Sequence, residues 1–152
     1  SPTARLSFDL PLAQQLAETF PASFGGDPLF KKASLTLLMV DAHIAARKTT
    51  EATPTITLNT IAAADYRLPQ AFSAQGVGII QLSPRLRQKL LAQKLVSIMD
   101  PDVVKLRTAS VVAAHRLCVQ SGQPMSVVDA ALWGAGRTLE KQGKTLPVMR
   151  VL

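Results

Sequence analysis

The sequence has little of the chemistry from which disulfides and metal sites are built. It contains a single cysteine, Cys118, and two histidines, His43 and His115, which stand far apart. One cysteine excludes an intrachain disulfide and a cysteine-rich metal site, so a reducing, cytoplasmic compartment is the simpler expectation. Cys118 falls within an apolar helical pattern, which predicts core packing rather than a nucleophile. The histidines have no ligand pattern around them and are expected on helix surfaces or half-buried, so we expect no metal and no cofactor.

Long apolar runs and phosphate-binding glycine motifs are also missing. No apolar run approaches the roughly 20 residues that a membrane-spanning helix requires, so no membrane association is expected. The first five residues lack the apolar centre of a secretory signal peptide. Gly76-x-Gly78 lacks the third glycine of a dinucleotide fingerprint. Because the first residue is not methionine, we expect the chain to be a fragment or a processed form.

The charge is strongly basic but dispersed. Lys and Arg total 17 against 10 Asp and Glu, which gives a net charge of +7. That balance favours anionic partners such as nucleotides, nucleic acid or an acidic protein surface. The basic residues form no tail or long run, however, so solvated helix faces are favoured over a nucleic-acid-binding stripe.

Capping residues followed by proline mark several expected helix starts. Asp27-Pro28, Ser83-Pro84 and Asp100-Pro101 each put a capping side chain before a proline whose φ is already helical. Apolar residues recur at helical spacing after these starts. The expected helices run from Asp9 and Pro11 to Phe20 (ended by Pro21), from Asp27 to Arg47–Lys48, from Asn59 or Thr60 to Asp65, from Pro69 to Gly76, from Ser83 onward, from Asp100 to Gly122 and from Ser126 to Gly143.

The remaining segments are expected to be extended, without a strand pair. They are residues 49–57, where β-branched residues surround Pro54, and the tail from Thr145 to Leu152. No repeat, low-complexity segment or linker divides the chain. Residues 1–152 are therefore predicted to form a single compact all-α domain.

The most informative run is Ala64-Asp65-Tyr66-Arg67-Leu68-Pro69-Gln70, which joins two expected helices. Asp65 follows Ile61 and three alanines, so its backbone is expected against the core. A carboxylate there must be paired, exposed in a cleft or shifted in pKa. From the residues alone, an ion pair of Asp65 with Arg67 or Lys31 that pins the helix joint is favoured over a functional carboxylate.

A second acidic position is Asp129, which stands four residues before Trp133, the only tryptophan. This spacing puts both on one helix face, a combination suited to a flat, partly cationic ligand. The alternative is a core tryptophan, with Asp129 placed favourably at a helix N-terminus. Lys31, in the first turn of its expected helix, gains nothing from the helix dipole, which suggests another use for it.

These residues and several collinear blocks resemble the queuosine salvage proteins, a family of queuosine-nucleotide N-glycosidases. Ala64 to Gln70 is similar to the family's Phe-Ala-Asp-Tyr-Arg-Val/Leu-Pro-Gln block. Two elements depart from the family pattern: Lys-Lys-Ala-Ser at 31–34 stands for Lys-Arg-Ala-Gln, and Val103-Val104-Lys105 replaces acidic residues. Weaker blocks in the same order are Thr19-Phe20-Pro21, Phe30 to Ser34, Gln75 to Gly78, Leu106-Arg107 and Val128 to Trp133.

The resemblance implies a helical, glycosylase-like domain that corresponds to the C-terminal half of family members. It implies hydrolysis of queuosine 5′-monophosphate or queuosine to release queuine for tRNA-modification salvage, with a small nucleotide as substrate and nucleic acid not bound directly. Asp65 would be the catalytic carboxylate. The implied substrate-binding residues are Lys31 beside it, Tyr66 and Arg67 shaping the pocket, Asp129 as counter-charge for the secondary amine of queuine, and Trp133 packing nearby.

Two other functions stay open. One is a nucleic-acid-binding helical module, which the +7 charge suits. The other is a non-catalytic fragment that needs a missing N-terminal half or a second chain as partner.

Overall fold

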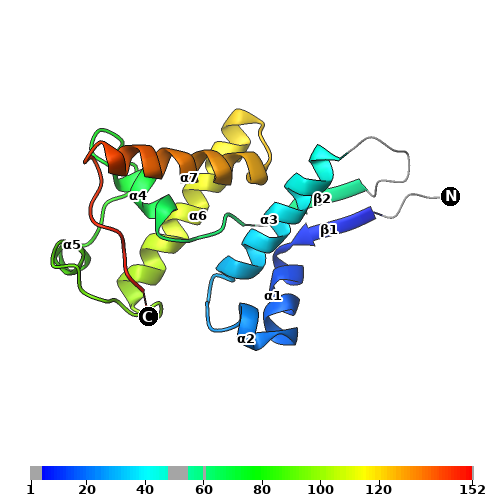
Figure 1. Ribbon diagram of the computed structural model, residues 1–152, viewed down its shortest axis with the longest axis horizontal. Coiled ribbons are helices and arrows are strands. Elements are labelled where there is room, and N and C mark those ends of the chain that lie inside the picture. The colour runs from blue at the N-terminus through cyan, green and yellow to red at the C-terminus, as the bar shows by residue number, and fades with distance from the viewer. Residues whose placement is uncertain (1–4, 48–54, 60, 152) are drawn as a thin grey trace.

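The computed structural model describes residues 5–47, 55–59 and 61–151, which form seven helices and two short strands (Figure 1). The predicted all-α fold class is confirmed. The elements are β1 (Arg5–Asp9), α1 (Leu10–Thr19), α2 (Pro21–Phe24), α3 (Lys31–Ala46), β2 (Thr55–Asn59), α4 (Arg67–Ser73), α5 (Pro84–Leu91), α6 (Pro101–Ser121) and α7 (Met125–Lys141). Within the described ranges no helix is both long and apolar enough to cross a membrane.

Three helices begin where the sequence predicts, at residues whose side chains cap amides only two or three positions along the chain. Asp9, Ser83 and Asp100 each cap a helix, accepting hydrogen bonds from the amides of Leu12 (3.0 Å), Leu86 (3.2 Å) and Asp102 (2.9 Å). A proline stands in the first turn of all three helices, where its missing N–H costs nothing. Gly122, at φ 66°, ends α6 as expected.

The prediction that Asp27-Pro28 starts a helix is wrong by several residues. Helix α3 begins at Lys31, after Phe30 in the left-handed conformation (φ 48°). The Asp27 carboxylate accepts hydrogen bonds from the amides of Leu29 and Lys31, so it shapes the loop before the helix. Pro21 does not simply end the preceding helix, because it starts the one-turn helix α2.

The predicted helix from Asn59 or Thr60 to Asp65 is absent. Thr55–Asn59 instead forms β2, which pairs in parallel with β1 in a register that joins Arg5 to Thr55 and Asp9 to Asn59. β-branched residues favour this strand, and the strand pair was not expected. Residues 61–64 are irregular, and Thr60 lies outside the described residues.

Smaller boundary corrections affect the later helices. Helix α4 begins two residues before Pro69 and ends before Gly76. Helix α7 begins at Met125, so Ser126 is not its cap. Beyond α7, the predicted extended tail makes a single β-bridge from Val151 to Val96.

Three apolar clusters hold the elements together. The first joins β1, α1 and α3 through Phe8, Ala13, Ala33 and Leu37. The second joins α3, α4, α6 and α7 around Phe72, and the third packs α5 and the C-terminal segment on α6. Cys118 packs against the second cluster, as predicted, and both histidines lie exposed on helices. The irregular segment 61–66 therefore runs between well-packed elements (Figure 1).

Helices α4 and α7 approach closely because α7 carries a glycine at the contact. A Cβ atom at Gly136 would lie 3.0 Å from the backbone oxygen of Arg67, the first residue of α4. A side chain there would therefore push α4 away from α7. Gly136 thus fixes the position of the helix that follows Asp65.

Candidate functional site

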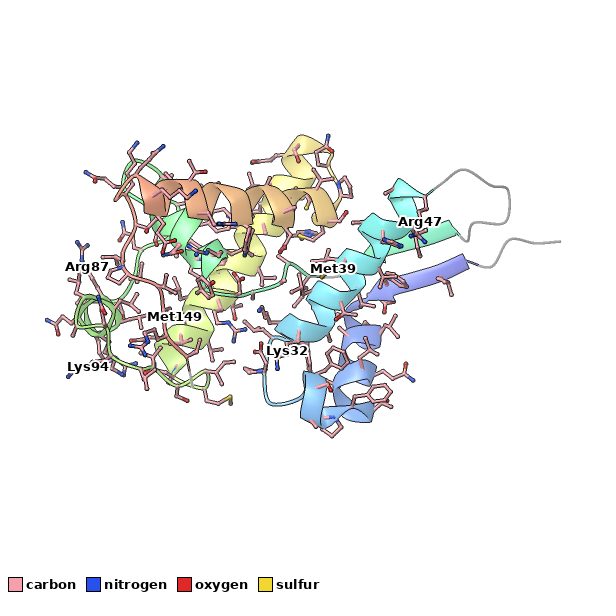
Figure 2. All side chains as sticks on the ribbon, viewed as in Figure 1. Lys32, Met39, Arg47, Arg87, Lys94 and Met149 are labelled. Carbon is pink, nitrogen blue, oxygen red and sulfur yellow. The ribbon has the colours of Figure 1, made fainter. Side chains whose placement is uncertain are left out.

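A cavity of about 460 Å³ opens where α3, α6 and the segment before α4 meet. Lys32 from the first turn of α3 and Met149 from the C-terminal segment both line it (Figure 2). Two carboxylates, three cations and two aromatic rings line the cavity. These residues are Asp27, Asp65, Lys31, Lys32, Arg107, Phe24 and Tyr66.

The Asp65 carboxylate is held by the backbone at the start of α4. Its Oδ1 accepts a hydrogen bond of 2.7 Å from the amide of Arg67. Burial raises the pKa of Asp65, although the amide bonds and the charge of Lys31 act against that increase. Within the described part of the chain Asp65 forms no ion pair, so the predicted pairing with Arg67 or Lys31 is wrong. Asp65 is thus an orientated carboxylate with spare acceptor capacity beside a cavity.

A buried ion pair that the sequence did not predict fixes the wall of the cavity. Arg107 on α6 donates from Nη1 and Nη2 to the two Asp27 oxygens, at 2.9 and 2.7 Å. Its Nε donates to the backbone oxygen of Ala64 at 2.7 Å, and the side chain is 4% exposed. Burial acts to raise the pKa of Asp27, but Arg107 and two backbone amides outweigh it and hold that pKa below the usual value.

Through this arrangement one guanidinium joins three parts of the site. Arg107 contacts Asp27, which binds the Lys31 amide, and it also contacts Ala64, which precedes Asp65. The only signal for Arg107 in the sequence was the Leu106-Arg107 block, and Asp27 was interpreted as a helix cap. Arg107 pairs with Asp27, while the ammonium groups of Lys31 and Lys32 have no hydrogen-bond or ion-pair partner among the described residues.

Asp129 lies behind the same segment and does not line the cavity. It is 8% exposed, and its Oδ1 accepts a hydrogen bond of 2.8 Å from the amide of Ala63. Burial, with a further contribution from the charge of Asp65, raises its pKa to about 6 against the opposing effects of the Ala63 amide and Lys31. Asp129 therefore anchors the residues before Asp65 and interacts electrostatically with it.

The other two predicted site residues lie outside the cavity. Arg67 sits over the Tyr66 ring, 4.9 Å from its centroid, and donates to Glu140 and Gln70. Trp133 is 41% exposed, with Arg137 over its ring, so it is not a core residue. The structure thus brings together Asp65, Lys31 and Tyr66, with Asp129 directly behind them. No group of three His, Cys, Asp or Glu side chains that could hold a metal is found in the described ranges.

These features define a mostly helical domain with an orientated, half-buried carboxylate at a cationic cavity. The family model described as queuosine salvage protein matches residues 28–152, which include every predicted site residue. The chain belongs to the queuosine salvage protein family, which confirms the resemblance and supports a role in queuosine salvage. The Thr19-Phe20-Pro21 block and Asp27 precede the matched region. No curated protein matches the sequence.

Proposed function

We propose that this chain carries the catalytic carboxylate of an N-glycosidase that hydrolyses queuosine 5′-monophosphate or queuosine and releases queuine. The observation that supports it most is Asp65: a carboxylate orientated by the Arg67 amide, facing a cavity and without an ion-pair partner among the described residues. A carboxylate with a purely structural role would be expected to have its acceptor sites satisfied.

The reaction breaks the bond between C1′ of the ribose and N9 of the base. Positive oxocarbenium character develops on the ribose, which the negative charge of Asp65 stabilises or captures covalently. The same carboxylate can instead activate water as a general base. Water supplies the hydroxyl that ends on C1′ and the proton that ends on the base. Queuine is a 7-deazapurine, so it has no N7 that could be protonated to help the base leave. More of the activation barrier must therefore be lowered by stabilising the sugar cation.

Neighbouring residues support these steps. Burial raises the pKa of Asp65 overall, and the charge of Lys31 limits that increase and so favours the ionised form. The Tyr66 ring lines the cavity, where it can contact the nucleoside. Arg67 acts from outside the cavity, through its amide to Asp65 and its guanidinium over Tyr66. The role of Asp129 as counter-charge for the queuine amine, with Trp133 nearby, stays a prediction, as does the cytoplasmic location.

The test is the Asp65→Asn variant, assayed for queuine release by chromatography. Asparagine keeps an oxygen that can accept from the Arg67 amide but removes the charge, so release should fall by about 10²- to 10⁴-fold while substrate binding persists. Asp41→Asn on α3, outside the cavity lining, is the matched control and should keep activity. Full activity in a folded, substrate-binding Asp65→Asn protein would refute the proposal.

One observation favours the alternative of nucleic-acid binding. A separate polar cavity of about 670 Å³ is lined by Arg87 and Lys144, with no carboxylate among its lining residues. If this cavity binds phosphates, affinity for tRNA should fall steeply as the salt concentration rises. The substitutions Arg87→Gln and Lys144→Gln should then make this salt dependence less steep. Weak binding without such a salt dependence would leave the small nucleotide as the favoured ligand.

The remaining alternative, an inactive chain that needs a partner half, predicts no queuine release until that partner is added.

A further inference from the structure

An apolar groove runs along α6, separate from the Asp65 cavity. Its volume is about 690 Å³, and none of its lining residues lines the Asp65 cavity. On α6 it extends from Val104 to Gln120, a length of about 24 Å at the helical rise per residue. Phe72, Ile79 and Ile80 form its other wall and its floor.

The α6 side of this groove is a second apolar stripe on a helix that already has a buried face. Val103, Leu106 and Ala114 face the core. Val104, Ala109 and Val112 face the groove instead, and Val112 is 46% exposed. Across from them, Ile79 is 60% exposed while Phe72 is buried at 2%. Apolar surface of this kind on a soluble domain indicates a binding site.

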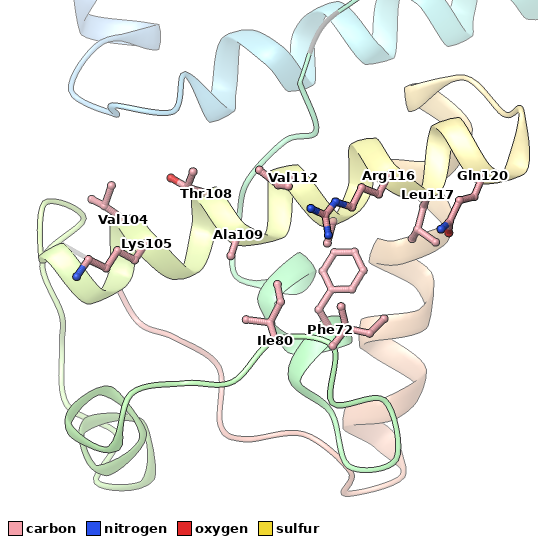
Figure 3. A pocket seen from close by; sticks show the side chains of 12 residues that line it. Phe72, Ile80, Val104, Lys105, Thr108, Ala109, Val112, Arg116, Leu117 and Gln120 are labelled. Atoms are coloured by element: carbon pink, nitrogen blue, oxygen red, sulfur yellow. The ribbon is translucent and has the colours of Figure 1, made fainter.

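The charges around the groove all have the same sign. Lys105 lies toward one end and Arg116 toward the other, and Phe72 and Ile80 face α6 from the opposite side (Figure 3). Within the described part of the chain neither cation has a hydrogen-bond or ion-pair partner, and the lining includes no carboxylate. An occupant is therefore expected to combine apolar side chains with negative charge.

We propose that the α6 groove binds an amphipathic helix of another polypeptide, with carboxylates flanking its apolar face. A straight, elongated groove with apolar anchors at helical spacing is the geometry that helices occupy in helix-in-groove complexes. A second copy of this chain fits less well, because a two-fold interface places Lys105 and Arg116 of one copy against the same cations of the other. A flat anionic membrane does not reach Phe72 at the floor of the groove.

The test uses two labelled helical peptides and fluorescence anisotropy. One peptide has leucines along one face with a glutamate at each end of that face, and the other has lysines in place of the glutamates. We expect the acidic peptide to bind and the basic peptide to bind at least about tenfold more weakly. The charge reversal Lys105→Glu with Arg116→Glu should invert this preference.

Two single substitutions on α6 separate the groove from the rest of the helix. Val112→Asp puts a carboxylate inside the groove and should weaken binding of the acidic peptide by about tenfold or more. Val119→Asp is the matched control, because Val119 is 71% exposed and does not line the groove, and it should leave affinity unchanged. Circular dichroism of both variants checks that they fold.

Several results would overturn the proposal. Absence of binding at millimolar peptide, or equal affinity for the two peptides, contradicts the charge argument. Self-association that Val112→Asp abolishes identifies a second copy as the occupant. Binding to phosphatidylserine vesicles instead of the acidic peptide identifies a membrane surface. Queuine release plays no part in these readouts, so they stand apart from the proposed reaction.

Discussion

At the scale of single residues, burial makes the ionisation of Asp129 energetically costly. Its pKa is about 6 in the folded protein, against 3.8 for a solvated carboxyl. Between these values the folded state holds a proton that the unfolded state has lost. The protonated Asp129 therefore stabilises the folded protein at low pH, and this contribution to the free energy of unfolding is lost as the pH rises through about 6. At pH 7 the ionised Asp129 costs roughly 3 kcal/mol, by the energy equivalent of each pKa unit.

The Asp129→Asn variant tests this cost. Asparagine can still accept from the Ala63 amide but cannot ionise, so the variant should gain stability relative to the native protein as the pH rises from 5 to 7. Denaturant unfolding at several pH values measures the difference, with Asp41→Asn as a control for the loss of one negative charge. A stability difference that is flat between pH 5 and 7 would show that Asp129 does not titrate there.

At the scale of elements, the contact between α4 and α7 depends on Gly136. Alanine there gains up to about 1 kcal/mol from helix propensity. The added Cβ, however, lies 3.0 Å from the Arg67 oxygen. Because the start of α4 is held by Asp65 and Glu140, it cannot move away freely, and overpacking of this kind costs about 1–3 kcal/mol. The Gly136→Ala variant is therefore expected to be less stable overall.

Gly134→Ala is the matched control on the same helix. A Cβ at Gly134 meets nothing within 4 Å, so only the propensity gain of about 0.5–1 kcal/mol should remain. Thermal unfolding should move the two variants in opposite directions from the native protein. If both were stabilised, α4 would have room to shift and Gly136 would not determine its position.

The elements also show how far the sequence predicts this structure. Ser83 and Asp100 cap helices through amides two or three residues away, so their helix starts could be predicted locally. Asp27 has the same Asp-Pro signal, but its carboxylate is engaged by Arg107, 80 residues distant, and no local rule includes that partner. The segment before Asp65 was expected to be helical because Asn59 or Thr60 can cap a helix there, yet Arg107 and Asp129 bind its backbone groups in an irregular conformation.

The candidate site likewise contains some features that the sequence predicts and others that depend on distant partners. Asp65, Tyr66 and Lys31 line one cavity, and Asp65 and Tyr66 belong to the block that resembles the family most directly. Asp129 and Trp133 share a helix by their spacing, but spacing does not show that one is buried and the other is 41% exposed. Arg67 lies next to Asp65 in sequence while its guanidinium is directed to Glu140, a residue 73 positions later.

At the scale of the whole molecule, Arg107 connects the N-terminal helices to the rest of the fold. Arg107→Met leaves the Asp27 carboxylate and the Ala64 oxygen buried without their partner, and loss of one member of a buried pair costs about 3–5 kcal/mol. Denaturant unfolding measures this loss. Arg116→Met, an exposed change on the same helix, should stay within about 0.5 kcal/mol of the native protein. Equal effects of the two substitutions would contradict a structural role for the pair.

The bonds that build the site also have consequences for folding kinetics. Asp129 binds Ala63 across 66 positions, Gln70 binds Leu146 across 76, and Arg107 binds Asp27 across 80. Most helical domains have low contact order, but here the decisive contacts are non-local, which slows folding. The cavity around Asp65 assembles only once distant parts of the chain have docked. The Ala63 amide, whose acceptor is Asp129, should accordingly exchange its proton with solvent only through large-scale opening, so its exchange rate reports the integrity of the site.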